Sequence, residues 1–271
     1  MSDYVDKVKA LYDSSPQLEW ERMDRNAFEF EITKRMISRY IKPGDSVLDI
    51  GGGPGRYSIW LAERGCRVTL VDLSDNSIEF AKRKFKERNL PVTALCADAR
   101  QIAKMDLGQF DHVLLMGPLY HLLDKTDRET VVNASLSCLK QDGYLFASFI
   151  QIFSEAINAL AHSPDIFLKS ESDKEYTTYL SSWKSWPYSG NDGFTAAYFI
   201  TPEEVVELMS NFPIERKHLF AQEGIISTKQ LESHNWDVAV RDKWMDIAYS
   251  LCEHPELLGY SEHLMYIGQK R

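Results

Sequence analysis

The residues with the clearest chemical potential form a glycine-rich loop that follows a short apolar run. Val47–Ile50 is apolar except for Asp49, and residues 51–55 read Gly-Gly-Gly-Pro-Gly. Glycine allows positive φ angles, so this backbone can approach a ligand closely. The dinucleotide fingerprint would need a further glycine where Arg56 stands, and the Gly-Lys-Ser/Thr end of a phosphate-binding P-loop is absent. The pattern predicts a strand, a ligand-binding loop that is not a phosphate cradle, and the start of a helix.

Acidic residues follow the next two apolar runs of the chain. Asp72 comes directly after the second run, and Asp98 follows the third. Asp72 lies 19 residues beyond Gly53, a spacing at which a carboxylate can accept both hydroxyls of a ribose. The carboxyl ends of parallel strands form the ligand crevice of an open sheet. We therefore expect both carboxylates beside the glycine loop, together with the segment Met116–His121 after the fourth run.

This order of features resembles the class I S-adenosylmethionine-dependent methyltransferases, in the broad group that includes the ubiquinone and menaquinone biosynthesis enzymes. Phe110–Val113 at the opening of the fourth strand and Leu139–Leu145 as a turn into the fifth strengthen the resemblance, which covers residues 28–150 and, more loosely, 201–271. It implies S-adenosylmethionine as cofactor, S-adenosylhomocysteine as product, and contact of Asp98 with the adenine amino group. The cofactor-binding residues that it implies are Asp49, Gly51, Gly53, Gly55, Asp72, Leu73, Asp98, Ala99 and Met116.

The segment after the fourth run is expected to lie beside the transferable methyl group. His121 is a candidate general base or polar contact, because an imidazole titrates near neutral pH; alternatively it bonds to backbone at the start of a helix. Tyr120 either lines the methyl site or packs. Gly117 stands where enzymes that methylate base amines carry Asn or Asp before Pro, and no Asp suited to magnesium occurs here. None of the seven histidines pairs at short ligand spacing, so we expect no metal.

Aromatic residues crowd residues 176–199, where they occupy eight of 24 positions against 12% of the whole chain. Such rings could enclose an apolar or aromatic acceptor, or could form the core of a cap or a dimer contact. The substrate-binding candidates are Tyr179, Trp183, Trp186 and Tyr198.

The N-terminal stretch combines aromatic and basic residues in a polar background. Similar methyltransferases close an N-terminal helix over the cofactor, so an arginine or tyrosine here could hold the methionine carboxylate. A solvated amphipathic helix is the alternative. The residues concerned are Tyr4, Tyr12, Trp20, Arg22 and Arg25.

Short apolar runs alternate with segments at helical spacing from about residue 45 onward. The runs are Val47–Ile50, Val68–Val71, Val92–Cys96, Val113–Met116, Tyr144–Ile150 and, near the end, Leu264–Ile267. Consecutive apolar residues are typical of strands covered on both faces. The alternation predicts an α/β fold with a doubly wound, Rossmann-like sheet, mostly parallel with an antiparallel last strand, plus helical and aromatic cap insertions.

Several local signals mark the ends of the predicted helices. We expect a left-handed stop at Gly65, an N-cap at Ser74, and capping boxes at Thr126-x-x-Glu129 and Thr201-x-x-Glu204. We expect one domain over residues 1–271, with N-terminal helices in 1–41, a cofactor-binding core in 42–150, a cap insertion in 151–200, and the rest of the sheet in 201–271. A helical insertion is expected at about 226–258, and both insertions on the ligand-binding side.

Composition narrows the function classes. The chain carries 31 Lys and Arg against 40 Asp and Glu, a net charge of −9, which argues against nucleic acid as the main partner. No apolar run approaches the ~20 residues of a membrane span and no signal peptide is evident, so we expect no membrane association. The cysteines (Cys66, Cys96, Cys138 and Cys252) are expected to be free thiols in a reducing cytoplasm.

The sequence thus leads to one principal hypothesis and two alternatives. We expect a cytoplasmic enzyme, monomeric or homodimeric, that transfers a methyl group from S-adenosylmethionine to a small-molecule acceptor. The alternatives are a methyltransferase acting on RNA or protein, and a module that binds S-adenosylmethionine without catalysis. Because the sulfonium is already activated, the protein would mainly position the reactants and exclude water.

Overall fold

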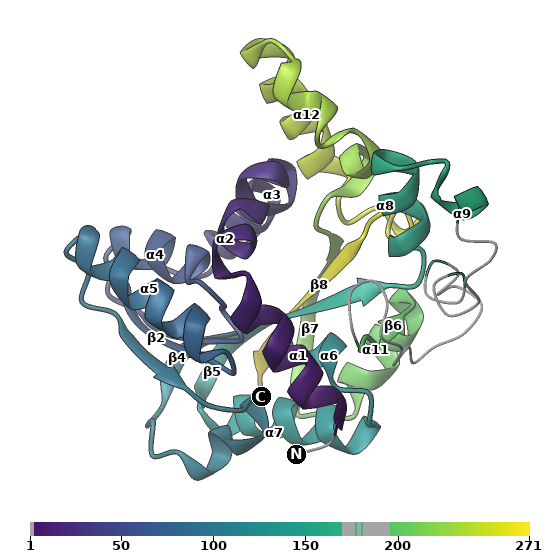
Figure 1. The fold of residues 1–271 in the computed structure, drawn as a ribbon. Coiled ribbons are helices and arrows are strands. Elements are labelled where there is room, and N and C mark those ends of the chain that lie inside the picture. Colours follow the sequence, from purple (N-terminus) through teal and green to yellow (C-terminus); the bar gives the residue numbers. More distant parts are fainter. Residues whose placement is uncertain (1–2, 170–176, 178–179, 181–195) are drawn as a thin grey trace.

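The computed structural model describes residues 3–169, 177, 180 and 196–271. Its sheet contains β1 (Ser46–Ile50), β2 (Arg67–Asp72), β3 (Thr93–Cys96), β4 (Phe110–Leu115), β5 (Leu139–Gln151), β6 (Phe199–Ile200), β7 (Ile214–Ala221) and β8 (His263–Lys270). The strand order is β3-β2-β1-β4-β5-β8-β7, with the short β6 also paired to β5. Strands β1 to β5 run parallel, and β8 lies antiparallel between β5 and β7 (Figure 1). The expected doubly wound sheet with an antiparallel last strand is confirmed.

Helices precede, separate and follow the strands. They are α1 (Asp3–Ser14), α2 (Pro16–Arg25), α3 (Ala27–Ile37), α4 (Arg56–Glu63), α5 (Asp75–Glu87), α6 (Pro118–His121), α7 (Lys125–Ser137), α8 (Ser154–His162), α9 (Ile166–Lys169), α11 (Pro202–Ser210) and α12 (Val238–Leu251). Short 3₁₀ segments occur at η1 (Ala99–Lys104), η3 (Gly224–Lys229), η4 (Glu232–Asn235) and η5 (Pro255–Leu257). In the described ranges no helix is long and apolar enough to cross a membrane.

Both faces of the sheet are covered, as the consecutive apolar runs predict. Val113 faces a cluster completed by residues of η1, α7 and α11, while the next residue, Leu114, faces a cluster completed by α3, α4 and α12. Both side chains are fully buried. Successive residues of a strand point to opposite faces, so a strand buried on both sides needs apolar residues in sequence rather than in alternation.

Three of the four predicted helix ends are observed and one is not. Gly65 has φ +86 after α4, Ser74 caps α5 by accepting from Ser77 N, and Thr201 forms a complete capping box with Glu204. The box expected at Thr126 is wrong. Helix α7 begins at Lys125 with Asp124 as N-cap and without a side-chain cap hydrogen bond, so Thr126 lies inside the helix.

The strand pattern also departs from expectation in two places. The predicted turn over residues 139–145 lies inside β5, where Asp142 takes φ +62 at a register irregularity against β4. Strand β7 is not signalled by an apolar run, because residues 215–217 are Glu, Arg and Lys. It sits at the sheet edge beyond β8, where charged side chains can reach water and discourage further strand pairing.

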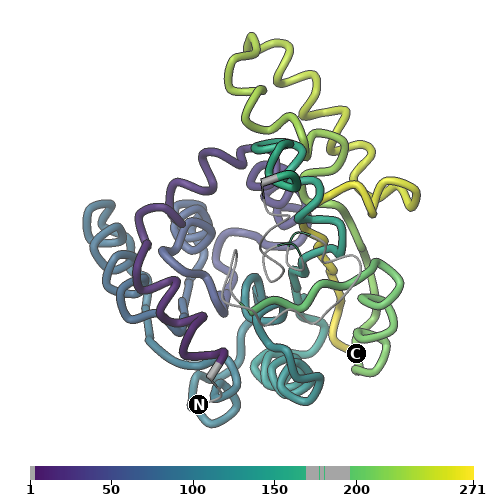
Figure 2. Tube along the Cα trace, turned by 45° about the vertical axis from the view of Figure 1, so that its right-hand side comes forward, coloured from purple at the N-terminus to yellow at the C-terminus, as the bar shows by residue number. Residues whose placement is uncertain are grey.

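The connections around β5 and β8 bring distant segments to the carboxyl edge of the sheet. Ile150, near the end of β5, pairs with His263 at the start of β8, and Ala221 at the end of β7 pairs with Leu264. The segments after β5 and after β7 therefore leave the sheet at one edge. Helices α1 and α2 pass beside α5 at the same side, and α12 projects from the body (Figures 1 and 2).

Candidate active site

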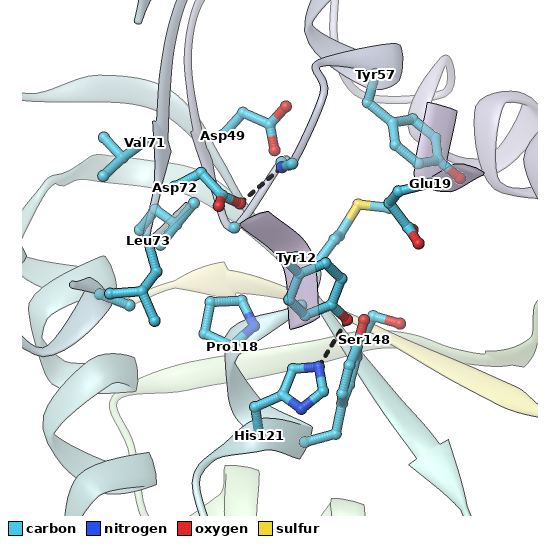
Figure 3. A pocket seen from close by; sticks show the side chains of 18 of the residues that line it. Tyr12, Glu19, Asp49, Tyr57, Val71, Asp72, Leu73, Pro118, His121 and Ser148 are labelled. Carbon is cyan, nitrogen blue, oxygen red and sulfur yellow. Dashed lines mark hydrogen bonds between the residues drawn. The ribbon is translucent and has the colours of Figure 1, made fainter. Parts of the chain in front are cut away.

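A cavity lies at the carboxyl edge of the parallel strands, beneath the N-terminal helices. The cavity together with the open space at its mouth measures about 1190 Å³. The segments after β1, β2, β3 and β4 line one part, whereas Ser148 of β5, Gln222 after β7 and His263 of β8 line the other. The strand order places these two parts on opposite sides of β4. Figure 3 shows Asp72 on one side of the cavity and Ser148 on the other.

The glycine loop fits closely against the segment after β4. Gly51 has φ +75, and a Cβ there would lie 2.4 Å from Cδ of Pro118, so only glycine fits. Gly51 and Gly53 line the cavity. Gly55 instead forms the N-cap of α4 and lies against Phe85, so its observed role is to shape the entry into that helix.

Asp72 is held at the cavity wall by backbone donors. The amide of Gly53 donates to Oδ2 and the amide of Ser74 donates to Oδ1, each at 2.8 Å. Burial raises the pKa of Asp72 to about 6 against the opposing effect of these two bonds. Each carboxylate oxygen still has a second lone pair, so the fixed side chain can accept from two further hydroxyls.

Asp49 supports the loop from below. Ser58 Oγ donates to its Oδ2 at 2.7 Å, and a Cβ on Gly52 would lie 2.5 Å from the same oxygen. Burial raises the pKa of Asp49 to about 7. Asp49, near the end of β1, therefore both lines the cavity and packs closely against the glycine loop.

Asp98 closes the end of the cavity beyond β3. Its Oδ1 accepts from the amide of Arg100 at 2.9 Å and caps η1, while Arg100 Nη2 donates to Oδ2 at 2.6 Å. These contacts outweigh burial and lower the pKa of Asp98. Leu73, Ala99 and Met116 line the cavity with it, as expected for all three.

The N-terminal helices carry a partly buried ion-pair network into the cavity. Arg22 Nε donates to Glu19 at 2.9 Å, and its two terminal nitrogens donate to Glu29 at 2.8 and 3.2 Å. Arg22, Glu19 and Glu29 all line the cavity. Of the other residues considered in this stretch, Arg25 donates to the Leu18 carbonyl and Tyr4 donates to Asp127.

His121 is engaged on both ring nitrogens. Nδ1 lies 3.0 Å from the carbonyl oxygen of Ala196, which can only accept, so Nδ1 carries the proton. Nε2 is then an acceptor, and the Tyr12 hydroxyl donates to it at 2.8 Å (Figure 3). Burial lowers the pKa of His121 to about 4. The geometry matches the backbone-bonded alternative, with the added tie to α1.

The remaining predicted site residues are distributed unequally. Tyr120 is partly buried in the cavity wall, and burial raises its pKa. Its carbonyl accepts from the amide of Tyr198, whose ring lies 3.6 Å from the Arg128 guanidinium carbon, and Tyr198 is not one of the described residues that line the cavity. Tyr179, Trp183 and Trp186 lie outside the described residues.

Sequence reasoning missed the polar far end of the cavity. Nδ1 of His263 lies 2.6 Å from Glu223 Oε1, while Ser148 donates to Gln222 at 2.7 Å. A ring nitrogen of His263 and one carboxylate oxygen from each of Glu29 and Glu223 lie within 4.8 Å of one another. No local spacing signals this group, because its members come from α3, the turn after β7, and β8.

Comparison with known proteins agrees with this geometry. Residues 47–143 match the family model of a methyltransferase domain. A ubiquinone biosynthesis O-methyltransferase of Chromobacterium violaceum is 34% identical over 105 residues, which are 39% of this chain and 44% of that protein. A putative methyltransferase, YqeM, of Bacillus subtilis is 37% identical over 100 residues, 36% of this chain and 40% of that protein. The matches thus span less than half of these two relatives.

Solved structures extend the similarity of fold to the whole chain. The magnesium protoporphyrin IX methyltransferase of Synechocystis PCC 6803, with bound S-adenosylhomocysteine, aligns with a TM-score of 0.59 at 13% identity, over 99% of this chain and 100% of that one. A methyltransferase from Methanosarcina mazei aligns with a TM-score of 0.55 at 18% identity, over 87% of this chain and 96% of that one. The fold is that of S-adenosylmethionine-dependent methyltransferases. The family match covers residues 47–143, and these residues carry the methyltransferase domain.

Proposed function

We propose that this protein transfers a methyl group from S-adenosylmethionine to a small-molecule acceptor held in the cavity. The observation that carries the proposal is the pairing of Asp72 with the glycine loop, through the 2.8 Å bond from Gly53 N. A carboxylate fixed in this way, with lone pairs left over, is suited to the two hydroxyls of a ribose. Asp98 at the end of β3 would then meet the adenine.

The N-terminal helices would hold the amino-acid end of the cofactor. Arg22 lies in the cavity wall with a guanidinium that has five donors, of which the contacts to Glu19 and Glu29 use three. A carboxylate that approaches Arg22 can therefore gain charge-assisted hydrogen bonds. This supports a role for Arg22, and not Arg25, in binding the methionine carboxylate.

A small acceptor is favoured by the enclosure of the cavity. Helices α1 and α2 supply Val5, Val8, Tyr12 and Met23 to its wall, so the site is covered by side chains from above. S-adenosylmethionine, when bound, supplies a methyl group on a positively charged sulfur. The residues of this chain would bind and orient the two reactants and exclude water from between them.

Binding calorimetry tests the cofactor assignment directly. S-adenosylmethionine and S-adenosylhomocysteine should bind in the micromolar range, while NAD should not bind. A radiolabelled-methyl assay with pools of small acceptors then tests turnover. Absence of heat and of a thermal shift with either cofactor form at millimolar concentration, together with binding of NAD, would refute the proposal.

A further inference from the structure

The far end of the cavity, away from the glycine loop, is buried yet strongly charged. Glu29 and Glu223 are 3% and 0% exposed, and Ser148 and Gln222 are also buried there. Ionised groups are costly to bury unless they are paired, so buried charges in a cavity commonly mark a functional site. Ser148 and Gln222 pair with each other, which leaves the charged groups to determine what this end can bind.

Carboxylates outnumber fixed cations at this end. Glu29 and Glu223 lie here, and Glu29 shares the guanidinium of Arg22 with Glu19, which stands beside the glycine loop. The remaining positive charge is the proton shared between Glu223 and His263. Burial, and secondly the negative charge of Glu223, raise the pKa of the neighbouring Glu262 to about 8. The fixed charges therefore leave a deficit of positive charge that a bound cation would fill.

His263 is oriented by Glu223 and accessible from the cavity. Glu223 Oε1 accepts from Nδ1 at 2.6 Å, and Glu223 Oε2 accepts from the His263 amide at 3.0 Å and from the Ser261 hydroxyl. Nε2 forms no hydrogen bond with any described residue, and the ring lies 6.4 Å from that of Tyr120, which follows β4. The imidazole is thus held with one nitrogen committed and the other available to a ligand.

We propose that Glu29, Glu223 and His263 bind the methyl acceptor through a protonated nitrogen, so that the acceptor is a small primary or secondary amine. This inference rests on the proposed function. The ligand atoms of the three residues lie within 4.8 Å of one another, a spacing that suits one ammonium group. Strand β8 and the turn after β7 place the group beyond β4, on the opposite side from Asp72.

The same residues account for the proton that the amine must lose before it attacks. In the free protein, Glu223 and Glu29 raise the pKa of His263 to about 9, against burial and the charge of Arg22. An ammonium group bound between the carboxylates replaces that positive charge, and His263 releases its Nε2 proton to solvent. Neutral Nε2 then accepts a proton from the ammonium. The free amine lone pair forms the new carbon–nitrogen bond as the carbon–sulfur bond breaks, and that electron pair remains on sulfur in S-adenosylhomocysteine.

Ligands that share a carbon skeleton test the charge preference. With saturating S-adenosylhomocysteine, the protein is titrated with propylamine, propanol and propanoate, and with 2-phenylethylamine, 2-phenylethanol and phenylacetate. We expect binding by at least one amine and by neither matched alcohol nor acid. Calorimetry at pH 7.5 in buffers of different ionisation enthalpy should show release of up to one proton on amine binding.

Variants assign the effect to the residues named. Glu29→Gln, which keeps its shape and can still accept from Arg22, should weaken amine binding about tenfold or more. His263→Asn should abolish proton release. Glu21→Gln on α2, whose carboxylate is exposed and outside the cavity, is the matched control and should bind amines normally.

Three results would overturn the inference. The first two are binding of an acid or alcohol in preference to its matched amine, and binding of none of the six ligands. The third is a thermal stabilisation by Mn²⁺ alone that exceeds the stabilisation by either amine and that Glu29→Gln removes. Affinity for S-adenosylhomocysteine is measured first in every variant. If the wild-type chain fails to bind it, the proposed function fails; if it binds normally and the ligand preference is wrong, only the amine assignment fails.

Discussion

The hydroxyl of Tyr12 donates a 2.8 Å hydrogen bond to Nε2 of His121, and so ties the first helix to the segment after β4. The other ring nitrogen of His121 donates to the carbonyl of Ala196, three residues before β6. One imidazole therefore connects helix α1, which covers the cavity, with the segment that leads into β6. Further ties from α1 run from Asp13 to Ser74, and from Tyr4 to Asp127.

Replacement of Tyr12 by Phe should make the N-terminal cover open more easily. The change removes one hydrogen bond and leaves a buried acceptor, Nε2 of His121, without its donor, at a cost of about 1–3 kcal/mol. We expect S-adenosylhomocysteine to dissociate roughly tenfold faster or more, as measured by stopped-flow displacement. Tyr4→Phe is the control. Tyr4 is on the same helix as Tyr12, but it bonds to Asp127 of α7 and does not line the cavity. Equal dissociation rates in the two folded variants would contradict this role.

Two histidines should give the stability opposite pH dependences. The folded-state pKa of His121 is lowered to about 4, so the folded protein binds fewer protons there than the unfolded chain, whose histidines titrate near 6.5. Its contribution is complete above pH 6.5 and is lost as the pH falls toward 4, up to about 3 kcal/mol. The pKa of His263 is raised to about 9, so its contribution is complete below pH 6.5 and is lost as the pH rises toward 9.

Urea unfolding at a series of pH values separates these two effects. His121→Gln should flatten the free energy of unfolding between pH 4 and 6.5, with no change in slope above that range. His263→Gln should do the reverse, flattening the profile between pH 6.5 and 9. If His121→Gln changes the profile only above pH 6.5, or His263→Gln only below it, the charge states assigned to the two rings are incorrect.

The cofactor side of the site could be predicted from sequence because its parts are local. Gly53 lies in the loop between β1 and α4, and Asp72 ends the adjacent parallel strand β2, so spacing along the chain reports their proximity. The far end of the cavity could not be predicted in this way, because its residues are distant in the sequence. Glu29 and His263 are separated by most of the chain and meet only because β8 returns antiparallel between β5 and β7.

Strand β7 shows why that return could not be foreseen. An edge strand needs only one paired side, and Glu215 and Lys217 on it are charged and paired with each other, so no apolar run marks it. Without β7 the position of Glu223 is undefined. The interpretation of His121 was limited in another way, since its partners Tyr12 and Ala196 are 109 and 75 residues away.

Substitution of Asp72 by Asn should weaken the cofactor and remove part of its pH dependence. An ionised carboxylate accepts two hydroxyl hydrogen bonds, whereas an amide offers one acceptor oxygen, so we expect a loss of about 1.5–3 kcal/mol in affinity. The pKa of Asp72 is raised to about 6, so wild-type affinity should fall as the pH drops through 6. Calorimetry from pH 5 to 8 checks both statements, with the exposed Asp106→Asn as control. An unchanged dissociation constant in folded Asp72→Asn would show that Asp72 does not bind the ribose.

Gly51 and Gly108 allow the effect of a close contact to be separated from that of backbone strain. Both have φ +75, so alanine at either position pays the same left-handed penalty of roughly 1–2 kcal/mol. A Cβ on Gly108 meets nothing within 4 Å, whereas one on Gly51 would lie 2.4 Å from Cδ and 2.7 Å from Cγ of Pro118. Gly51 and Pro118 both line the cavity, so a side chain at Gly51 requires the glycine loop or the start of α6 to move.

Gly51→Ala should therefore lose more stability than Gly108→Ala, and should also lose affinity for S-adenosylhomocysteine. Pro118 has little freedom to yield, because its ring restricts the backbone at the first residue of α6. Gly108→Ala should bind the cofactor as the wild-type protein does, since that loop is away from the cavity. Urea unfolding and calorimetry on the two variants provide the comparison. Equal losses of stability, with cofactor affinity retained in both, would mean that the loop tolerates a side chain at Gly51 and that its close fit against Pro118 is not needed for binding.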